Sequence, residues 1–154
     1  MILMTEIKRG ETAPAFEGPT SDGSKLSLKD FTGKKNVVLY FYPKDDTPGC
    51  TKEACSFRDN IKSLRDLGAE IVGVSLDSVE SHSKFTDKYN LSFPLVSDKD
   101  KQIATAYGVL KDTGTSTSRV TFIIDKKGKI AKIFPKVDVA KHTEEVIAAL
   151  KELS

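Results

Sequence analysis

Two cysteines, Cys50 and Cys55, are the residues of this chain best suited to covalent chemistry. Cys50 follows Thr47-Pro48-Gly49, a sequence typical of a helix start, with Thr47 as the cap and Pro48 at the first helical position, where its missing N–H is harmless. Cys50 then falls in the first turn, where unpaired backbone N–H groups and the helix dipole favour an anion. We therefore expect the thiol to ionise well below pH ~8.5, and the thiolate is the reactive form. The alternative is that Cys50 is a small buried hydrophobic residue on one stripe with Ala54 and Phe57.

Cys55 lies on a different side of the same predicted helix. Five residues of helix rotate it by ~140° and raise it by ~7.5 Å relative to Cys50, toward Arg58, Asp59 and Lys62. The resulting Cα separation of ~8.6 Å exceeds the ~7 Å limit for a disulfide, so a bridge requires the first helical turns to unwind. We predict such a redox switch, with a bystander thiol at Cys55 as the alternative.

Buried strands and helices alternate around this segment. Val37 to Tyr42 is a continuous β-branched and aromatic run, typical of a central strand buried on both faces. The helix that follows carries apolar residues at helical spacing as far as Leu64, and Gly68 is a good stop. Around this unit we expect a hairpin between 16–19 and 25–28, strands at 70–76, 93–96, 120–125 and 129–134, and helices at 79–89, 101–107 and 139–150. The pattern predicts an α/β sandwich with a mixed central sheet. In open α/β sheets, ligands bind where a buried strand passes into its helix, which is where Cys50 stands.

Composition excludes several classes of protein. The 154 residues carry a net charge of only +2, with lysines interspersed among carboxylates, which argues against nucleic-acid binding. The longest apolar run, Val37 to Tyr42, is far shorter than the ~20 residues of a membrane helix. The first residues lack the basic start of a signal peptide, so we expect a cytoplasmic protein without a membrane partner. Two cysteines are too few for a disulfide scaffold.

Three motifs make the chain resemble the peroxiredoxins, in the branch called bacterioferritin comigratory protein or peroxiredoxin Q, nearly end to end. They are Gly10-Glu11-Thr12-Ala13-Pro14-Ala15-Phe16, the run from Pro43 through Thr47 and Cys50 to Asp59, and Arg119-Val120-Thr121-Phe122-Ile123-Ile124-Asp125. The resemblance implies one thioredoxin-like domain over residues 1–154, monomeric and free of metal or organic cofactor. It also implies a peroxidase that reduces hydrogen peroxide and organic hydroperoxides, with thioredoxin or a similar dithiol as its reductant.

The same resemblance assigns roles to five residues. Cys50 would be the peroxidatic cysteine, Cys55 the resolving cysteine of an atypical two-cysteine enzyme, Thr47 and Arg119 the residues that hold peroxide, and Pro43 a shield over the pocket. The chemistry agrees, because thiolate attack on peroxide places negative charge on the departing oxygen, which a fixed cation and a hydroxyl stabilise. An arginine can contact sulfur and peroxide oxygens together. From sequence alone, Arg119 could equally be an edge-strand charge or part of a salt bridge. Thr47 could be only a helix cap, a structural role that is compatible with the catalytic one.

The sequence predicts structural roles for the other ionisable residues near the cysteines and for the two histidines. We expect Glu53 to stabilise the helix start, Asp45 and Asp46 to make the turn, and His82 and His142 to lie on helix surfaces. Since the two histidines match no ligand spacing with the cysteines, a zinc site is not indicated. Two readings of the cysteine pair remain as alternatives: a thiol-disulfide oxidoreductase, whose cysteines are normally two residues apart rather than four, and a non-enzymatic redox sensor.

Overall fold

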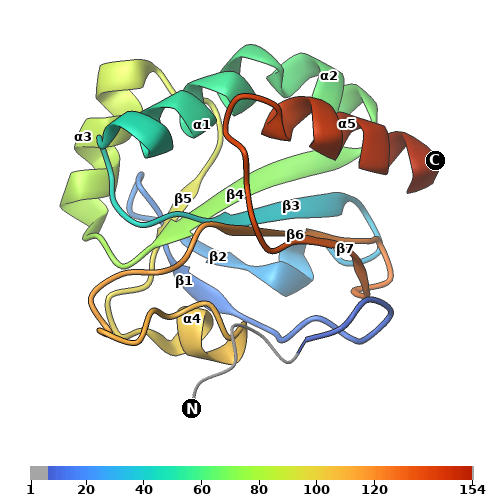
Figure 1. Ribbon diagram of the computed structural model, residues 1–154, viewed down its shortest axis with the longest axis horizontal. Helices are drawn as coiled ribbons and strands as arrows, with labels where there is room; N and C mark the ends of the chain where they lie inside the picture. The colour runs from blue at the N-terminus through green and yellow to red at the C-terminus, as the bar shows by residue number, and fades with distance from the viewer. Residues whose placement is uncertain (1–6, 154) are drawn as a thin grey trace.

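The computed structural model describes residues 7–153 and is built on a five-stranded mixed sheet (Figure 1). The strand order is β5-β4-β3-β6-β7. The sheet strands are β3 (Asn36–Phe41), β4 (Ala69–Ser75), β5 (Leu95–Ser97), β6 (Val120–Ile124) and β7 (Ile130–Phe134). The strands β3, β4 and β5 run parallel, whereas β6 and β7 are antiparallel to their neighbours.

Strand β3 is at the centre of the sheet and is buried along its whole length. Its alternate side chains enter two separate hydrophobic clusters. Val38, Tyr40 and the following Tyr42 pack on the face that also holds Cys50 and Phe57, and Leu39 and Phe41 pack on the other face. Burial on both faces explains why the strand is a continuous apolar run.

Helices cover the Cys50 face, and a small hairpin with a short helix covers the other (Figure 1). The elements on the Cys50 face are α1 (Pro48–Asp59), α2 (Ile61–Asp66), α3 (Val79–Tyr89) and α5 (His142–Leu153). On the other face lie β1 (Glu17–Pro19), β2 (Lys25–Ser27), the single 3₁₀ turn η1 (Leu28–Asp30) and α4 (Gln102–Ala106). Because β3 leads directly into α1, the start of α1 stands at the carboxyl end of the central strand.

Most predicted elements are confirmed, including the mixed sheet and the antiparallel hairpins at both ends. Two helix predictions needed correction. The helix expected to run unbroken to Gly68 is divided at Asn60, whose side chain donates a hydrogen bond to the Ser56 carbonyl. The last helix begins at His142 rather than Val139, because residues 139–141 form turns.

The predicted absence of a signal peptide concerns residues 1–6 above all, and these lie outside the described residues. In the part of the chain that is described, 7–153, no helix has both the length and the apolar character needed to cross a membrane.

Candidate active site

The first turn of α1 carries Cys50 as the sequence predicts. Thr47 is the N-cap residue in an extended conformation, and Pro48 is the first helical residue. The Thr47 hydroxyl donates to the Lys44 carbonyl at 2.8 Å and makes no capping bond to the helix. The Cys50 side chain is buried, with 1% of its surface exposed, against the sheet face that holds Tyr40 and Tyr42.

Arg119 brings a cation to the sulfur of Cys50. The residue directly precedes β6, which pairs with β3, and this pairing places its side chain beside the start of α1. The Nη2 of Arg119 donates to Cys50 Sγ at 3.3 Å. The Arg119 side chain is partly buried, with 21% of it exposed to solvent. Strand β6 lies between β3 and β7, so Arg119 is not an edge-strand charge, whereas the alternative of a salt bridge does occur, with Glu53.

Glu53 is the second partner of Arg119, and its predicted role as a helix-start stabiliser needs correction. Arg119 Nη1 donates to Glu53 Oε1 at 2.8 Å, and the Glu53 side chain is 1% exposed. Burial raises the pKa of the Glu53 carboxyl to about 7, although the Arg119 guanidinium acts in the opposite direction. The buried carboxyl therefore fixes the position of the guanidinium. Near neutral pH a large fraction of this carboxyl remains protonated.

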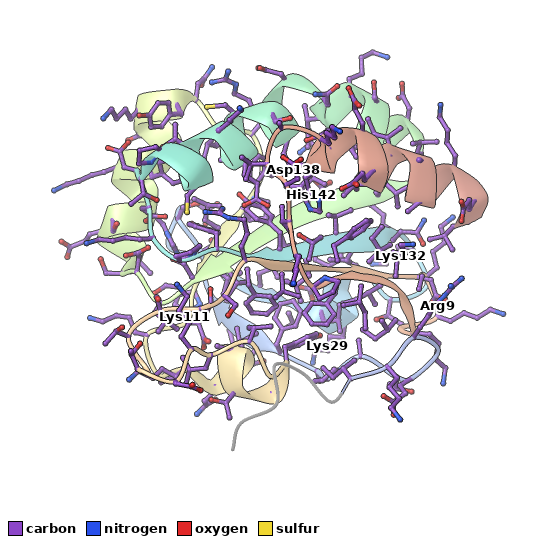
Figure 2. The ribbon with its side chains drawn as sticks, in the orientation of Figure 1. Arg9, Lys29, Lys111, Lys132, Asp138 and His142 are labelled. Atoms are coloured by element: carbon purple, nitrogen blue, oxygen red, sulfur yellow. The ribbon has the colours of Figure 1, made fainter. Side chains whose placement is uncertain are left out.

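His142 closes this cluster from α5, so the prediction that it lies on a helix surface is wrong. Figure 2 shows it between the start of α5 and the sheet, and its Nε2 lies 2.8 Å from Thr121 Oγ1 and 4.0 Å from Glu53 Oε2. Burial and, secondarily, the charge of Arg119 lower the pKa of His142 to about 4. The imidazole is therefore neutral at physiological pH and adds no second cation beside Glu53 and Arg119.

Gly49 allows Arg119 to approach closely. A Cβ at this position would stand 3.0 Å from Arg119 Nη2 and 3.7 Å from its Cζ. Few real Cβ atoms have so short a contact, so the guanidinium would have to shift. The requirement at residue 49 is therefore space for the cation that contacts Cys50.

Cys55 is partly buried further along the continuous helix α1, and both cysteines are free thiols. Two contacts tie this part of α1 to its neighbours. Ser56 and Thr143 hydroxyls lie 2.7 Å apart, and Arg58 Nη1 donates to the Tyr89 carbonyl at 2.6 Å. In this conformation, helix α1 holds the two thiols on different turns.

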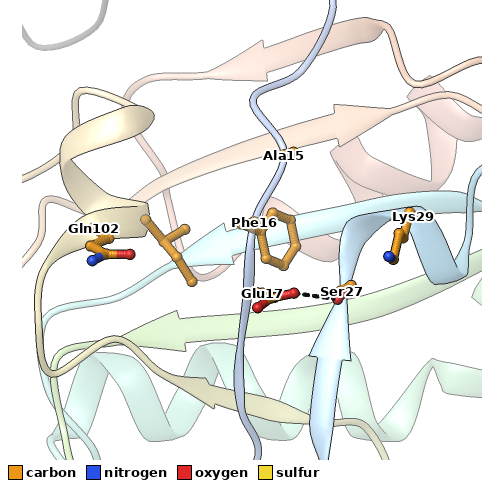
Figure 3. Close-up of a pocket in the computed structure, with 7 residues that line it drawn as sticks. Ala15, Phe16, Glu17, Ser27, Lys29 and Gln102 are labelled. Carbon is orange, nitrogen blue, oxygen red and sulfur yellow. Dashed lines mark hydrogen bonds between the residues drawn. The ribbon is translucent and has the colours of Figure 1, made fainter.

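Pro43 lines a cavity of about 550 Å³ together with Lys44, Leu76, Asp77, Thr115 and Ser116. The last two residues come from the segment 111–118, to which no sequence motif assigns a role. The neighbouring Thr117 hydroxyl donates to the Tyr42 carbonyl at 3.0 Å, and this bond holds the segment against the end of β3. A second hollow of about 380 Å³, shown in Figure 3, lies on the other face around Phe16 and Ile103 and contains none of the predicted site residues.

Asp45 and His82 form a buried pair beneath the loop that leads into α1. His82 Nδ1 lies 2.7 Å from Asp45 Oδ2, with 0% and 4% of the two side chains exposed. Asp45 lies in the turn as predicted, and its side chain is in addition buried. The prediction of a surface histidine at 82 is wrong. Asp46 also belongs to the turn, with φ of 56°, and is exposed.

The burial of Glu53, His82 and His142 could have been predicted from the sequence. Glu53 is three residues after Cys50 and next to Ala54, within the buried stripe of α1. His82 precedes the buried Phe85 by three residues, and His142 precedes the buried Val146 by four. Helical spacing from an apolar neighbour therefore predicts burial for all three polar side chains.

Comparison with known proteins agrees with this geometry. Residues 9–133 match the AhpC/TSA family. The chain is 49% identical over 150 residues to a putative peroxiredoxin bcp of Coxiella burnetii, covering 94% of this chain and 99% of that one. It is 44% identical to peroxiredoxin Bcp of Bacillus subtilis, with 96% and 98% coverage. It is also similar to the chloroplastic peroxiredoxin Q of Populus jackii, at 42% identity over 98% of this chain and 71% of that one.

Solved structures give the same result. Peroxidoxin BcpB of Mycobacterium tuberculosis superposes with a TM-score of 0.90 at 34% identity, covering 97% of this chain and 99% of that one. The bacterioferritin comigratory protein of Xanthomonas campestris, a structure reported for its alkyl peroxide reduction activity, gives 0.86 at 36% identity, with 97% and 98% coverage. The fold is the thioredoxin-like fold of peroxiredoxins.

The chain belongs to the AhpC/TSA family and, within it, to the peroxiredoxins of the Bcp and peroxiredoxin Q type. It is a thiol peroxidase that carries the two cysteines of an atypical two-cysteine enzyme.

Proposed function

We propose that Cys50 is the peroxidatic cysteine. Its thiolate attacks the hydroxyl oxygen of a hydroperoxide, an S–O bond forms as the O–O bond breaks, and the departing oxygen takes a proton and leaves as water or an alcohol. Cys50 becomes a sulfenic acid, so the sulfur is oxidised by two electrons and the peroxide is reduced by two. The observation that carries this proposal is the 3.3 Å contact between Arg119 Nη2 and Cys50 Sγ.

Arg119 and Thr47 hold the peroxide in this proposal. The guanidinium stabilises both the thiolate and the negative charge that grows on the departing oxygen, because its donors are fixed by Glu53 before the substrate arrives. The Thr47 hydroxyl donates its hydrogen bond to the Lys44 carbonyl, so its oxygen is free to accept a hydrogen bond from the peroxide O–H. Pro43 shields the reacting groups from solvent in this proposal, and it also lines the 550 Å³ cavity.

Cys55 resolves the sulfenic acid. Its thiol attacks Cys50 Sγ, a disulfide forms, and the sulfenic oxygen leaves as water. The ~8.6 Å separation expected for two cysteines five residues apart on a helix exceeds what a disulfide spans, so α1 unwinds between them. Because Glu53 lies between the two cysteines, unwinding also breaks its ion pair with Arg119.

An external dithiol reopens the disulfide and completes the cycle. Peroxiredoxins act on peroxides with thioredoxin-type reductants, and we propose thioredoxin itself for this chain, acting on a monomer in the cytoplasm. We also propose a single domain over residues 1–154. Within the described residues 7–153, one shared sheet with a hydrophobic cluster on each face supports it.

Intact-mass analysis tests the sequence of steps. The reduced protein is mixed with one equivalent of hydrogen peroxide, and digestion under non-reducing conditions locates the product. We expect the loss of two hydrogens and a peptide bridged between Cys50 and Cys55. A stable oxygen adduct on Cys50 in the wild-type protein, or a bridge between two chains, would rule out Cys55 as the intramolecular resolving residue.

A further inference from the structure

The peptide unit between Lys44 and Asp45 is held from both sides. Its N–H, on Asp45, donates to Asp77 Oδ2 at 2.8 Å. Its carbonyl, on Lys44, accepts the Thr47 hydroxyl at 2.8 Å. A peptide unit is planar, so fixing its N–H also fixes the direction of its carbonyl. The orientation of the Thr47 hydroxyl therefore depends on Asp77.

The Asp45 side chain anchors the same peptide from below. Its Oδ1 accepts the Tyr42 hydroxyl at 2.6 Å, and its Oδ2 accepts the Ser81 hydroxyl at 2.7 Å. His82 Nδ1 lies 2.7 Å from Oδ2, and His82 Nε2 lies 3.0 Å from the Val96 carbonyl, to which it must donate. The carboxylate is thereby tied to β3, α3 and, through His82, to β5.

Asp77 is fixed in turn by the ends of β4 and β5. Its Oδ2 also accepts the Ser75 hydroxyl at 2.7 Å, and its carbonyl accepts the Ser97 hydroxyl at 2.6 Å. Asp45, Asp77 and His82 offer side-chain atoms within 4.8 Å of one another, an arrangement that resembles a metal site. Protein donors and acceptors already occupy both oxygens of Asp45, Asp77 Oδ2 and both ring nitrogens of His82, so hydrogen bonding accounts for the cluster.

We infer that Asp77, with Asp45, is a positioning residue for peroxide reduction that acts through the Lys44–Asp45 peptide to orient Thr47. The inference rests on the proposed role of Thr47 in holding peroxide. Asp77 orients the Lys44 carbonyl, and that carbonyl accepts the hydrogen bond of the Thr47 hydroxyl. The lone pairs of the Thr47 oxygen then face the peroxide O–H. Neither carboxylate exchanges a proton with the substrate in this scheme. Because a small error in the position of a reacting group lowers the rate by up to about 100-fold, we expect the loss of this anchoring to slow peroxide reduction measurably.

A double-mutant cycle tests the inference, with the second-order rate of peroxide reduction by the reduced protein as the readout. Asp77→Ala frees the peptide and should lower the rate by about tenfold or more. Asp77→Asn keeps an acceptor for the Asp45 N–H and should restore most of that loss. In a Thr47→Val background, Asp77→Ala should have no further effect, because the group through which it acts is already gone.

Each alternative outcome has a definite meaning. If Thr47→Val alone reacts at the wild-type rate, the proposed role of Thr47 fails, and this inference fails with it. If Thr47→Val is slow but Asp77→Ala is not, or if the two losses multiply, the inference alone is wrong. Asp66→Ala, which removes an exposed carboxylate, is the matched control and should be unchanged. Should Asp77→Ala not fold, as judged by thermal unfolding, Asp77→Ser replaces it in the same cycle.

Discussion

The guanidinium of Arg119 spans Cys50 and Glu53, with Nη2 3.3 Å from the sulfur and Nη1 2.8 Å from the carboxyl oxygen. One side chain from the start of β6 thus joins a nucleophile and a buried carboxyl that are three residues apart on α1. In the proposed mechanism, the carboxyl fixes the cation and the cation stabilises the charge of the reacting groups. We therefore predict that peroxide reduction depends on this bridge.

Gly49→Ala should impair the bridge without destabilising the fold. The added methyl group would stand 3.0 Å from Arg119 Nη2 and displace it from Cys50 Sγ. Alanine is a better helix former than glycine, by about 1 kcal/mol, so thermal stability should be kept or increased. Stopped-flow kinetics should show at least a tenfold slower reaction with peroxide. An equally stable and equally fast variant would contradict this prediction, because it would show that the guanidinium accommodates the methyl group without slowing the reaction.

Arg119→Lys keeps the charge but should lose most of the activity. A lysine ammonium is a single point donor and does not span Cys50 and Glu53 as the planar fork does. Removing one preorganised donor to a developing oxyanion costs about 10²–10³ in rate, and we expect a loss of that size in peroxide reduction. Arg65→Lys, at an exposed arginine paired with Glu70, is the control. Near wild-type kinetics for Arg119→Lys would mean that charge alone suffices.

Glu53→Gln should change how stability depends on pH. The pKa of Glu53 is raised in the folded state to about 7 from 4.5, so folding becomes less favourable as pH rises from about 4.5 to 7. Over that window the wild type should lose about 3 kcal/mol relative to the glutamine variant. The free energy of unfolding of both proteins, measured in urea from pH 5 to 8, gives the difference directly.

His142 changes the pH dependence of stability in the opposite direction to Glu53, and it remains present in the Glu53→Gln variant. Its pKa is lowered in the folded state to about 4 from 6.5, so its contribution to stability is full above pH 6.5 and is lost as pH falls toward 4. The Glu53→Gln variant should therefore gain stability between pH 5 and 6.5. The exposed Glu152→Gln control should keep a constant difference from wild type. A constant difference for Glu53→Gln as well would contradict the assignment of a raised pKa.

Cys55→Ser should separate the first oxidation from turnover. Cys50 and its contacts with Arg119 are untouched by the change, so one equivalent of peroxide should be consumed at nearly the wild-type rate. Without a resolving thiol the sulfenic acid persists, so peroxide consumption should stop after one equivalent, and a coupled thioredoxin assay should show no NADPH oxidation because no disulfide forms for thioredoxin to reduce. Continued thioredoxin-linked turnover at the wild-type rate would exclude Cys55 from the cycle.

The local features of the fold could be predicted from sequence because their signals are local. The apolar run of β3, the Thr47-Pro48 helix start and the turns between strands follow from residue types within a few positions. The break between α1 and α2 could not be predicted from apolar spacing, because Ile61 and Leu64 continue the stripe of α1. The break depends instead on the Asn60 side chain, which bonds back to Ser56.

The burial of Glu53 and Asp45 depends on contacts with residues far away in the sequence. Glu53 is buried because Arg119, 66 residues away, pairs with it, and Asp45 because His82, 37 residues away, lies against it. Local rules place carboxylates at helix starts and turns on the surface, and tertiary pairing overrides those rules here. Helical spacing would have predicted the burial of Glu53, His82 and His142, but it could not have named their partners.

Stopped-flow measurement of peroxide consumption by the Cys50→Ser protein tests the central claim most directly. The serine variant retains Arg119, Glu53, Thr47 and Cys55, so only the reacting sulfur changes. We predict that peroxide is not consumed, whereas Cys55→Ser under the same conditions consumes one equivalent. Rapid loss of peroxide with the Cys50→Ser protein would contradict the assignment of Cys50 as the reacting residue.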